Sequence, residues 1–377
     1  MGRYLNPGME SFEKSVNSEI YVDKTGLVGY TNRVMNTVQG YVCVSRPRRF
    51  GKSMAANMLT AYYSRGCDSR EIFSKFEISE SPDFEKYRNK YNTIFLNMQE
   101  FLSRSDSVEA LVDRVKKLVL RDLKREYPDV DYFDDTDLVE SMQDIYETEK
   151  CPFVVIIDEW DCIFREFRQN KEAQEKYLDF LRDLLKDKAC IHLAYMTGIL
   201  PIKKYGTHSA LNMFDEFSMI NPGPLAPYVG FTEVEVEYLC HKYRMDMEEV
   251  KAWYDGYSFS MAASVYSPRS VVNSMLFGKI ENYWNQTETF EALQVYIDMN
   301  FDGLKDDVLS MIAGERIPVN TGSFTNDMTT FRTEDDVLTL LIHLGYLAYD
   351  SENKVVKIPN NEVRNEYVNS VAASDWG

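Results

Sequence analysis

The stretch that decides the fold reads Gly40-Tyr-Val-Cys-Val-Ser45, then Arg46-Pro-Arg-Arg-Phe-Gly-Lys-Ser53 and Met54. The apolar run at its start predicts a buried strand, and residues 55–65 after it predict a helix. Between the two lies a basic loop that ends in Gly51-Lys52-Ser53. The rest of the chain can be interpreted outward from this strand, loop and helix.

The loop has most of the features of a phosphate-binding loop. Such a loop needs glycine, four residues and then Gly-Lys-Ser or Gly-Lys-Thr, because main-chain N–H groups wrap the phosphates while the lysine reaches the β- and γ-phosphates and the hydroxyl binds Mg²⁺. Arg46 stands at the first glycine position, whereas Gly51, Lys52 and Ser53 satisfy the rest of the pattern. The alternative is a basic surface turn that caps a helix. The candidate nucleotide-binding residues are Arg46, Pro47, Arg48, Arg49, Phe50, Gly51, Lys52, Ser53 and Met54.

A second element lies about 100 residues further on, at Pro152-Phe-Val-Val-Ile-Ile157 and Asp158-Glu159. A continuous apolar run without alternation is typical of a strand buried on both faces of a parallel sheet. At the carboxyl end of such a strand, Asp158 is expected to hold Mg²⁺ together with Ser53, and Glu159 to polarise a water for attack on a γ-phosphate. The alternative is that the two carboxylates cap the next helix.

Other candidate residues have weaker support. Thr197 closes an apolar strand at 190–196, and either it is a polar sensor of the γ-phosphate or it merely precedes a turn at Gly198. An arginine finger often comes from a neighbouring subunit, which would make the protein a homo-oligomer. The candidates for neutralising phosphate charge within the chain are Arg48, Arg49, Lys203 and Lys204.

Five strands separated by helices predict a doubly wound α/β domain with a parallel sheet. The predicted strands cover residues 40–45, 93–98, 152–157, 190–196 and 216–220, and the clearest helices between them cover 107–125 and 171–186.

After the Pro/Gly cluster at 221–230 the chain becomes mainly helical, with a capping box at Thr232 and Glu235. A helix, a hairpin and a helix between residues 333 and 371 resemble a winged helix. We therefore expect three domains: an ATPase core at 1–230, a helical lid-like region at 231–300 and a winged-helix-like region at 301–377.

Composition narrows the class of protein. The chain of 377 residues carries a net charge of −18, which disfavours broad nucleic-acid binding. No apolar run approaches the ~20 residues of a membrane-spanning helix, and no export signal is visible, so we expect a cytoplasmic protein without membrane contact. Its six cysteines are scattered, which favours reduced thiols over disulfides or a transition-metal site.

Several motifs in order resemble the bacterial AAA-ATPase-like family, whose members commonly carry a C-terminal PD-(D/E)XK nuclease-like domain. The resemblance implies ATP binding and hydrolysis on a P-loop NTPase core of the additional-strand, catalytic-glutamate type, followed by helical and winged-helix-like regions. It implies further that Arg46 is a family trait. The nuclease-like domain is absent from this chain and is expected, if anywhere, as a partner. The motifs are Tyr21-Val-Asp-Lys-Thr25, the 46–53 loop, Ile157-Asp-Glu159, Thr197-Gly-Ile-Leu200, Ser209-Ala-Leu-Asn212, Gly230-Phe-Thr-Glu233, Trp253-Tyr-Asp-Gly-Tyr257 and Tyr266-Ser-Pro268.

The sequence thus predicts a Mg²⁺-dependent ATPase that acts as a molecular switch or motor module, in processes linked to nucleic acid, mobile elements or defence. Lys52, Glu159 and Thr197 are its expected catalytic residues, and no nuclease activity is expected. One alternative is a nucleotide-dependent DNA-interaction module that uses residues 301–377, although the acidic run Phe301-Asp-Gly-Leu-Lys-Asp-Asp307 argues against it. The other is a degenerate scaffold that does not hydrolyse ATP.

Overall fold

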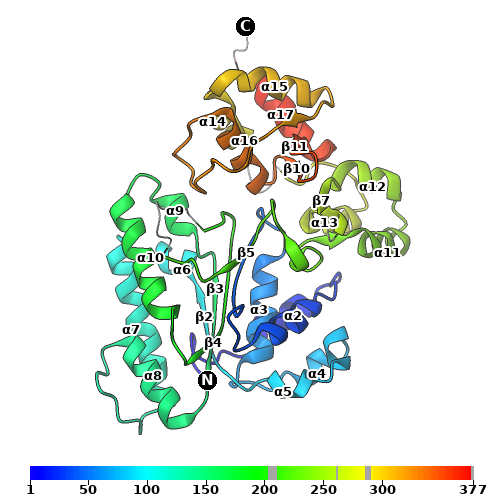
Figure 1. The fold of residues 1–377 in the computed structure, drawn as a ribbon. Helices are drawn as coiled ribbons and strands as arrows, with labels where there is room; N and C mark the ends of the chain where they lie inside the picture. Colours follow the sequence, from blue (N-terminus) through cyan, green and yellow to red (C-terminus); the bar gives the residue numbers. More distant parts are fainter. Residues whose placement is uncertain (203–209, 260–261, 285–289, 375–377) are drawn as a thin grey trace. The chain divides into compact units, whose positions relative to one another are not determined.

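The computed structural model describes residues 1–202, 210–259, 262–284 and 290–374 (Figure 1). The chain divides into two compact units. The first unit holds Met1–Val44, Lys52–Gly198 and residues 210–216, and the second holds Ser45–Gly51, residues 199–202 and the described residues from Phe217 onward.

The first unit is built on a five-stranded sheet in the order β2-β3-β4-β1-β5. Strands β2, β3 and β4 pair in parallel. All six residues of β3 are buried, as the unbroken apolar run predicts. The predicted doubly wound α/β fold is confirmed. The strands are β1 (Tyr41–Ser45), β2 (Asn92–Asn97), β3 (Phe153–Asp158), β4 (Ile191–Gly198) and β5 (Asp215–Phe217).

Helices cover both faces of this sheet. Helix α3 packs on β2, β3 and β4 from one side, with α1 and α2 beside it, and α7, α8 and α10 lie on the other (Figure 1). Helix α7 begins where expected, because the Ser107 side chain accepts from the Ala110 N–H. The helices are α1 (Glu10–Val16), α2 (Gly26–Val34), α3 (Lys52–Tyr63), α4 (Arg70–Phe73), η1 (Glu77–Glu80), α5 (Phe84–Tyr87), α6 (Met98–Ser103), α7 (Val108–Glu126), α8 (Leu138–Glu149), α9 (Cys162–Glu166) and α10 (Lys171–Leu185).

Strand β5 is shorter than the predicted strand at 216–220. It ends at Phe217 because Ser218 starts a turn: the Ser218 N–H donates to the Asn221 carbonyl at 3.1 Å. The Ser218 hydroxyl also accepts from the N–H groups of Ile220 and Asn221. A serine that bonds its own following backbone offers the chain an alternative to a strand ladder.

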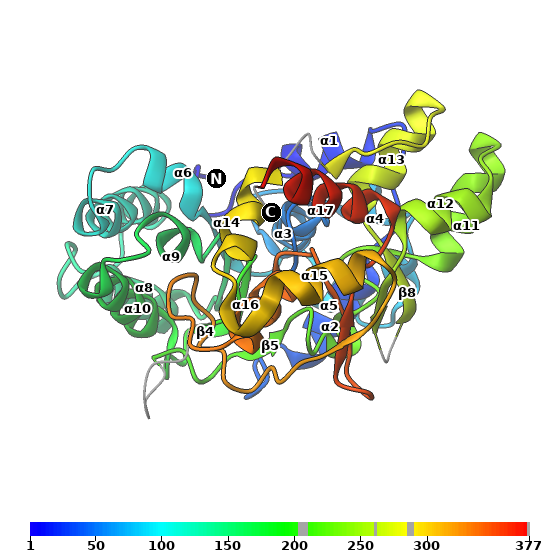
Figure 2. The ribbon, with the colours of Figure 1, turned by 90° about the horizontal axis from the view of Figure 1, so that it is seen from above.

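The second unit contains more strand than the mainly helical region that the sequence predicts. Two three-stranded antiparallel sheets, β6-β8-β7 and β10-β11-β9, lie among its helices. Helices α11 and α12 lie side by side, as do α14 and α17 (Figure 2). The strands are β6 (Phe231–Thr232), β7 (Tyr257–Phe259), β8 (Ala262–Tyr266), β9 (Ile317–Pro318), β10 (Ala348–Asp350) and β11 (Val355–Lys357). The helices are η2 (Gly223–Leu225), α11 (Glu233–Tyr243), α12 (Met247–Tyr254), α13 (Pro268–Phe277), α14 (Phe290–Asp298), η4 (Phe301–Gly303), α15 (Leu304–Ile312), α16 (Glu334–His343) and α17 (Asn361–Ala373).

Two local predictions for this unit are confirmed. The capping box at the start of α11 is formed, with the Thr232 N–H donating to Glu235 Oε1 at 2.9 Å. The helix-hairpin-helix order at the end of the chain is present as α16, β10, β11 and α17. The expected regions 231–300 and 301–377 both lie within the second unit, and their separation into two domains stays a prediction. Within the described ranges, no helix is both long and apolar enough to cross a bilayer.

A buried carboxylate joins three parts of the second unit. Glu362, in the first turn of α17, is fully buried and accepts from the Ser270 hydroxyl at 2.8 Å. It also accepts from the N–H groups of Tyr283 and Trp284 at 2.7 and 3.1 Å. Burial raises the pKa of Glu362 to about 7; the three donors oppose the shift, and the nearby charge of Glu366 adds to it.

We therefore expect Glu362 to make stability depend on pH. Between its ordinary pKa of 4.5 and its native pKa of about 7, the folded protein holds a proton that the unfolded chain has lost. The stabilising contribution is fully present below the lower value and is lost as pH rises through the higher one, a change of up to about 3 kcal/mol. In calorimetric melting between pH 4.5 and 7, Glu362→Gln should flatten this decline, whereas the exposed Glu352→Gln should keep the parent's slope. Parallel curves for parent and Glu362→Gln would contradict this account.

Candidate functional site

The carboxyl ends of three neighbouring strands place polar side chains at one edge of the sheet in the first unit. In the parallel register, Asn97 of β2 lies opposite Asp158 of β3, and Asp158 lies opposite Thr197 of β4. Asn97 is already engaged, because its side chain accepts from the N–H groups of Gln99 and Glu100 as the N-cap of α6. Asp158 and Thr197 lie beside it at the same edge.

Asp158 and Ser53 are in direct contact. The Ser53 hydroxyl, in the first turn of α3, donates to Asp158 Oδ2 at 2.7 Å. Burial raises the pKa of Asp158, while the hydrogen bond from Ser53 and the charge of Lys52 act in the opposite direction. A hydroxyl and a carboxylate oxygen at this distance suit a hard cation such as Mg²⁺, which takes few protein ligands and keeps waters and phosphate oxygens as the others. In the part of the chain that the structure describes, no cluster of three or more acidic, histidine or cysteine residues is arranged as a metal site.

Lys52 is buried among acidic groups of the same unit. Lys52 is the first residue of α3 and is 5% exposed. Burial lowers the pKa of Lys52 to about 8, against the opposing charges of Glu159, Asp161 and Asp158. An ammonium that has lost most of its water gains more from an anionic ligand than an exposed lysine would.

Glu159 has an unusual backbone conformation. Its φ of 54° lies in the left-handed region, which non-glycine residues seldom adopt, and its N–H donates to Asp158 Oδ1 at 3.0 Å. Its side chain is 27% exposed and accepts through Oε2 from Arg165 Nη2. The glutamate is thus held at both its main chain and its side chain.

Arg165 is a site residue that sequence reasoning missed. It lies in the short helix α9, its side chain is 8% exposed, and its Nη2 also approaches Asp161 Oδ1 at 3.4 Å. Burial lowers the pKa of Arg165, but the charges of Asp161 and Glu159 outweigh burial and hold the pKa above its ordinary value. The only sequence signal is the four-residue spacing of Asp161 and Arg165 directly after the acidic pair, which is common on helices.

Thr197 lies near the carboxyl end of β4. Its Oγ1 is buried and has no hydrogen-bond partner among the described residues, and buried polar groups without partners are rare. The neighbouring Gly198 has a packing reason, because a Cβ there would lie 2.5 Å from Asp161 Oδ1 and 2.9 Å from Trp160 Cδ1. Thr197 can therefore be either a polar sensor of the γ-phosphate or a residue that merely precedes the turn at Gly198, and the sensor role stays a prediction.

The first part of the loop, Ser45–Gly51, belongs to the second unit. Arg46 is fully buried there, with Nη1 donating to the carbonyls of Ser45 and Phe217 at 2.8 and 3.0 Å and Nε donating to that of Val229 at 3.3 Å. Its guanidinium carbon lies 5.5 Å from the centre of the Phe259 ring. The Arg46 side chain thus bonds main-chain carbonyls through Nε and Nη1.

Two more loop residues pack against the same unit. A Cβ at Gly345, whose φ is 86°, would lie 2.7 Å from Pro47 Cγ, so this approach requires glycine. The Phe50 ring meets the Tyr257 ring edge to face, with centroids 5.5 Å apart. These contacts fix the loop by its apolar side chains.

The remaining predicted loop residues are accessible. Arg48 and Arg49 are exposed, and Gly51 has a φ of 90° with open space where a Cβ would be. Burial and then the neighbouring charges of Arg269 and Arg48 lower the pKa of Arg49, as expected where cations gather.

Met54 is 42% exposed on α3. Lys203 and Lys204, also predicted to neutralise phosphate charge, lie outside the described residues.

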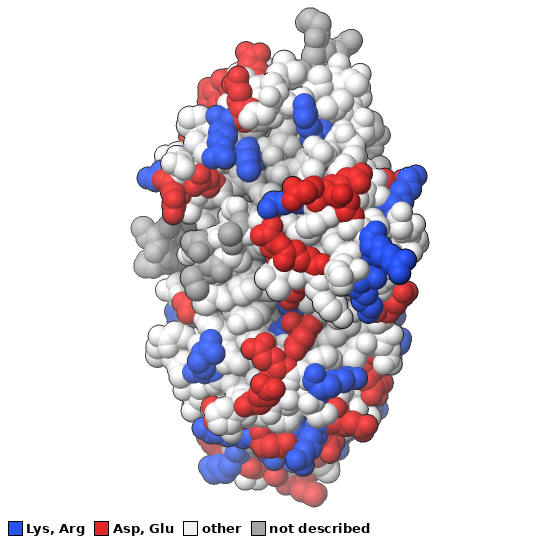
Figure 3. Space-filling model, turned by 90° about the vertical axis from the view of Figure 1, so that its right-hand side faces the viewer, with Lys and Arg blue, Asp and Glu red and all other residues white. Residues whose placement is uncertain are grey.

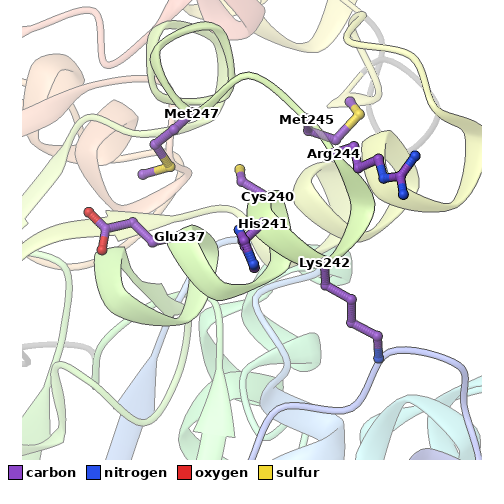
Figure 4. A pocket seen from close by; sticks show the side chains of 7 residues that line it. All are labelled: Glu237, Cys240, His241, Lys242, Arg244, Met245 and Met247. Atoms are coloured by element: carbon purple, nitrogen blue, oxygen red, sulfur yellow. The ribbon is translucent and has the colours of Figure 1, made fainter.

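A pocket of about 800 Å³ lies elsewhere in the second unit. Its lining comes from α11 and the start of α12, and Figure 4 shows Lys242 and Arg244 extending in different directions. The polar groups of the lining do not converge on one point, as they do in sites that orient a ligand. The lining residues are Glu237, Cys240, His241, Lys242, Arg244, Met245 and Met247.

The sheet order defines the class of protein. Strand β4 separates β1, which precedes the Gly-Lys-Ser loop, from β3, which carries the acidic pair, as in P-loop NTPases of the additional-strand, catalytic-glutamate type. The profile of the predicted AAA-ATPase family matches residues 6–207, more than half of the chain, and the chain belongs to this family.

Individual relatives are distant. An uncharacterised protein encoded in the vnfD 5′ region of Azotobacter chroococcum mcd 1 is 25% identical over 298 residues, which cover 75% of this chain and 54% of that protein. The chain therefore matches about half the length of this relative.

Solved structures are similar only in outline. A Walker-type ATPase of Pyrococcus abyssi superposes with a TM-score of 0.46 at 13% identity, over 92% of this chain and 94% of that one. The ORC2 protein of Aeropyrum pernix, in ADPNP and ADP complexes, superposes with a TM-score of 0.37 at 12% identity, over 94% and 97%. At these scores neither likeness says what this chain binds.

The contacts of Arg46 lead to a test. Arg46→Gly restores the residue of the usual loop pattern, yet it leaves the distant carbonyls of Phe217 and Val229 without this donor and opens a cavity. We expect a loss of about 3 kcal/mol in stability, seen as a melting temperature several degrees lower. Arg48→Gly, which changes an exposed neighbour, should melt much closer to the parent. A parent-like melting temperature for Arg46→Gly would show that these bonds contribute little.

Proposed function

We propose that the chain binds ATP with Mg²⁺ and hydrolyses it. The observation that carries this proposal is the 2.7 Å contact between Ser53 and Asp158, which joins the loop helix to the acidic strand of the same unit. In the proposed site, Lys52 binds the β- and γ-phosphates, the N–H groups of the loop surround them, and Ser53 and Asp158 hold Mg²⁺. Thr197 is proposed to hydrogen-bond the γ-phosphate or the attacking water through its unpartnered hydroxyl.

The excess of acidic over basic side chains around Lys52 supports a requirement for Mg²⁺. Three carboxylates, those of Asp158, Glu159 and Asp161, stand against the two cations Lys52 and Arg165. An ATP molecule with several negative charges would meet this acidic group unfavourably on its own. Bound Mg²⁺ would neutralise charge on the phosphate oxygens.

The hydrolytic step is proposed to use Glu159 as the base. Glu159 accepts a proton from water, whose oxygen attacks the γ-phosphorus, and the bond to the bridging oxygen of the β-phosphate breaks. The products are ADP and inorganic phosphate. The partial exposure of Glu159 leaves room for a water beside a carboxylate that is otherwise fixed.

We also propose that hydrolysis drives a switch or motor. The support is the division of the loop: Ser45–Gly51 packs with the second unit, whereas Lys52 starts a helix of the first. The separate lid-like and winged-helix-like domains and an oligomer with a shared arginine stay part of this proposal. A nuclease-like partner and a link to mobile elements or defence stay expectations from the family resemblance.

The DNA-interaction alternative has less support. On the face in Figure 3, basic residues lie in small groups with acidic residues between them. The described part of residues 301–377 also includes the acidic residues Asp302, Asp306 and Asp307.

Two substitutions test the enzyme proposal. Glu159→Gln should retain ATP binding and lower the turnover number by about 10²–10⁴-fold, because the base is lost. Lys52→Ala should weaken ATP binding by roughly tenfold or more, because a charged partner of the phosphates is lost. ATP binding is measured by calorimetry and turnover by phosphate release, with the exposed Glu166→Gln as the matched control. The proposal fails if the parent does not turn over ATP, or if both variants behave like the parent.

The metal role of Ser53 has its own test. Chelation of Mg²⁺ should abolish turnover, and Ser53→Ala should raise the Mg²⁺ concentration for half-maximal rate by at least roughly tenfold, since even outer-shell partners of a metal are worth that much. Ser53→Thr keeps the hydroxyl and should need Mg²⁺ close to the parent's concentration. Identical Mg²⁺ titrations of parent and Ser53→Ala would remove Ser53 from the metal site.

A further inference from the structure

Arg165 occupies a position that packing alone does not explain. Its side chain is buried within the first unit, yet it points its charge at Glu159, the base of the proposed reaction. Burying a guanidinium is costly unless it is paired, and both of its partners are carboxylates of this site. Asp161, itself fully buried, lies on the other side of Arg165 at 3.4 Å.

The contact uses only one oxygen of the glutamate. Arg165 Nη2 donates to Oε2, and no described residue bonds Oε1. The main chain of Glu159 is fixed separately, through its N–H and its left-handed φ. With the backbone and one oxygen held, the direction of the second oxygen is largely determined.

The arrangement repeats a general feature of activated groups. A base is commonly oriented by a third group that does not touch the substrate. Here the order would be Asp161, Arg165, Glu159 and then water. Because both described contacts of Arg165 Nη2 are to carboxylates, the geometry favours an action through Glu159 over direct contact with phosphate.

We propose that Arg165 is a positioning residue for hydrolysis, which holds Oε2 of Glu159 so that Oε1 faces the attacking water. This inference rests on the proposed function of Glu159. Asp161 in turn holds Arg165 in place.

A double-mutant cycle on the full chain tests this role, with steady-state and single-turnover ATP hydrolysis as readouts. Arg165→Met should lower the turnover number by about 10–100-fold, since small misplacements of reacting groups have effects of this size, with the KM for ATP within about twofold of the parent's. In a Glu159→Gln background, the same substitution should change the remaining rate by less than about threefold, because the group that it positions is already lost. An equal loss in both backgrounds would show that Arg165 acts on the phosphate directly and would overturn the proposal.

Further variants separate positioning from folding. Arg165→Lys, which keeps the charge, should recover part of the rate, and Arg168→Met, three residues on, should keep the parent's rate. Since Arg165→Met leaves Asp161 buried without its partner, the Asp161→Asn, Arg165→Met double variant is measured beside it. If that double variant folds and turns over like the parent, or if Arg165→Met loses ATP binding together with its rate, the positioning role is wrong. A parent without ATPase activity would instead overturn the proposed function itself.

Discussion

The hydrogen bond between Ser53 and Asp158 is the contact on which the site depends. It forms only if the first turn of α3 and the last residue of β3 come within 2.7 Å, although 105 residues separate them in the chain. Two features meet this condition: β3 is buried along its whole length, and α3 packs across β2, β3 and β4. The acidic surroundings of Lys52 follow from the same juxtaposition, because Asp158 and Glu159 arrive with the end of β3.

The fold was largely predictable because its main elements are long and have strong patterns. The apolar run before Asp158 and the amphipathic stretch that became α7 left few alternatives. Most of the strands that the sequence did not predict, namely β6, β7 and β9, are two or three residues long and are too short to have a period, whereas β8 has five residues. They exist because tertiary neighbours pair with them, and no single stretch of sequence contains that information.

The candidate site likewise contains residues that the sequence predicted and one that it did not. Ser53, Asp158 and Glu159 lie in linear motifs, and the structure gathers them with Lys52 in one unit. Arg165 lies in no motif, and only the structure reveals its contact with Glu159 from the short helix α9. Arg46 shows the opposite case: it stands in a motif, yet its side chain bonds carbonyls 171 and 183 residues away. A position in a pattern predicts where the backbone runs better than it predicts what a long side chain contacts.

The burial of Arg46 also constrains how this protein can evolve. A change to glycine at that position is a simple one, but the carbonyls of Phe217 and Val229 would need a new donor, and the space beside Phe259 a new occupant. Those compensations would have to come first, at sites that give no benefit while the arginine is present. The residue is therefore entrenched: its replacement depends on the order in which other mutations occur, and descendants of this chain should keep it long after their surfaces have diverged.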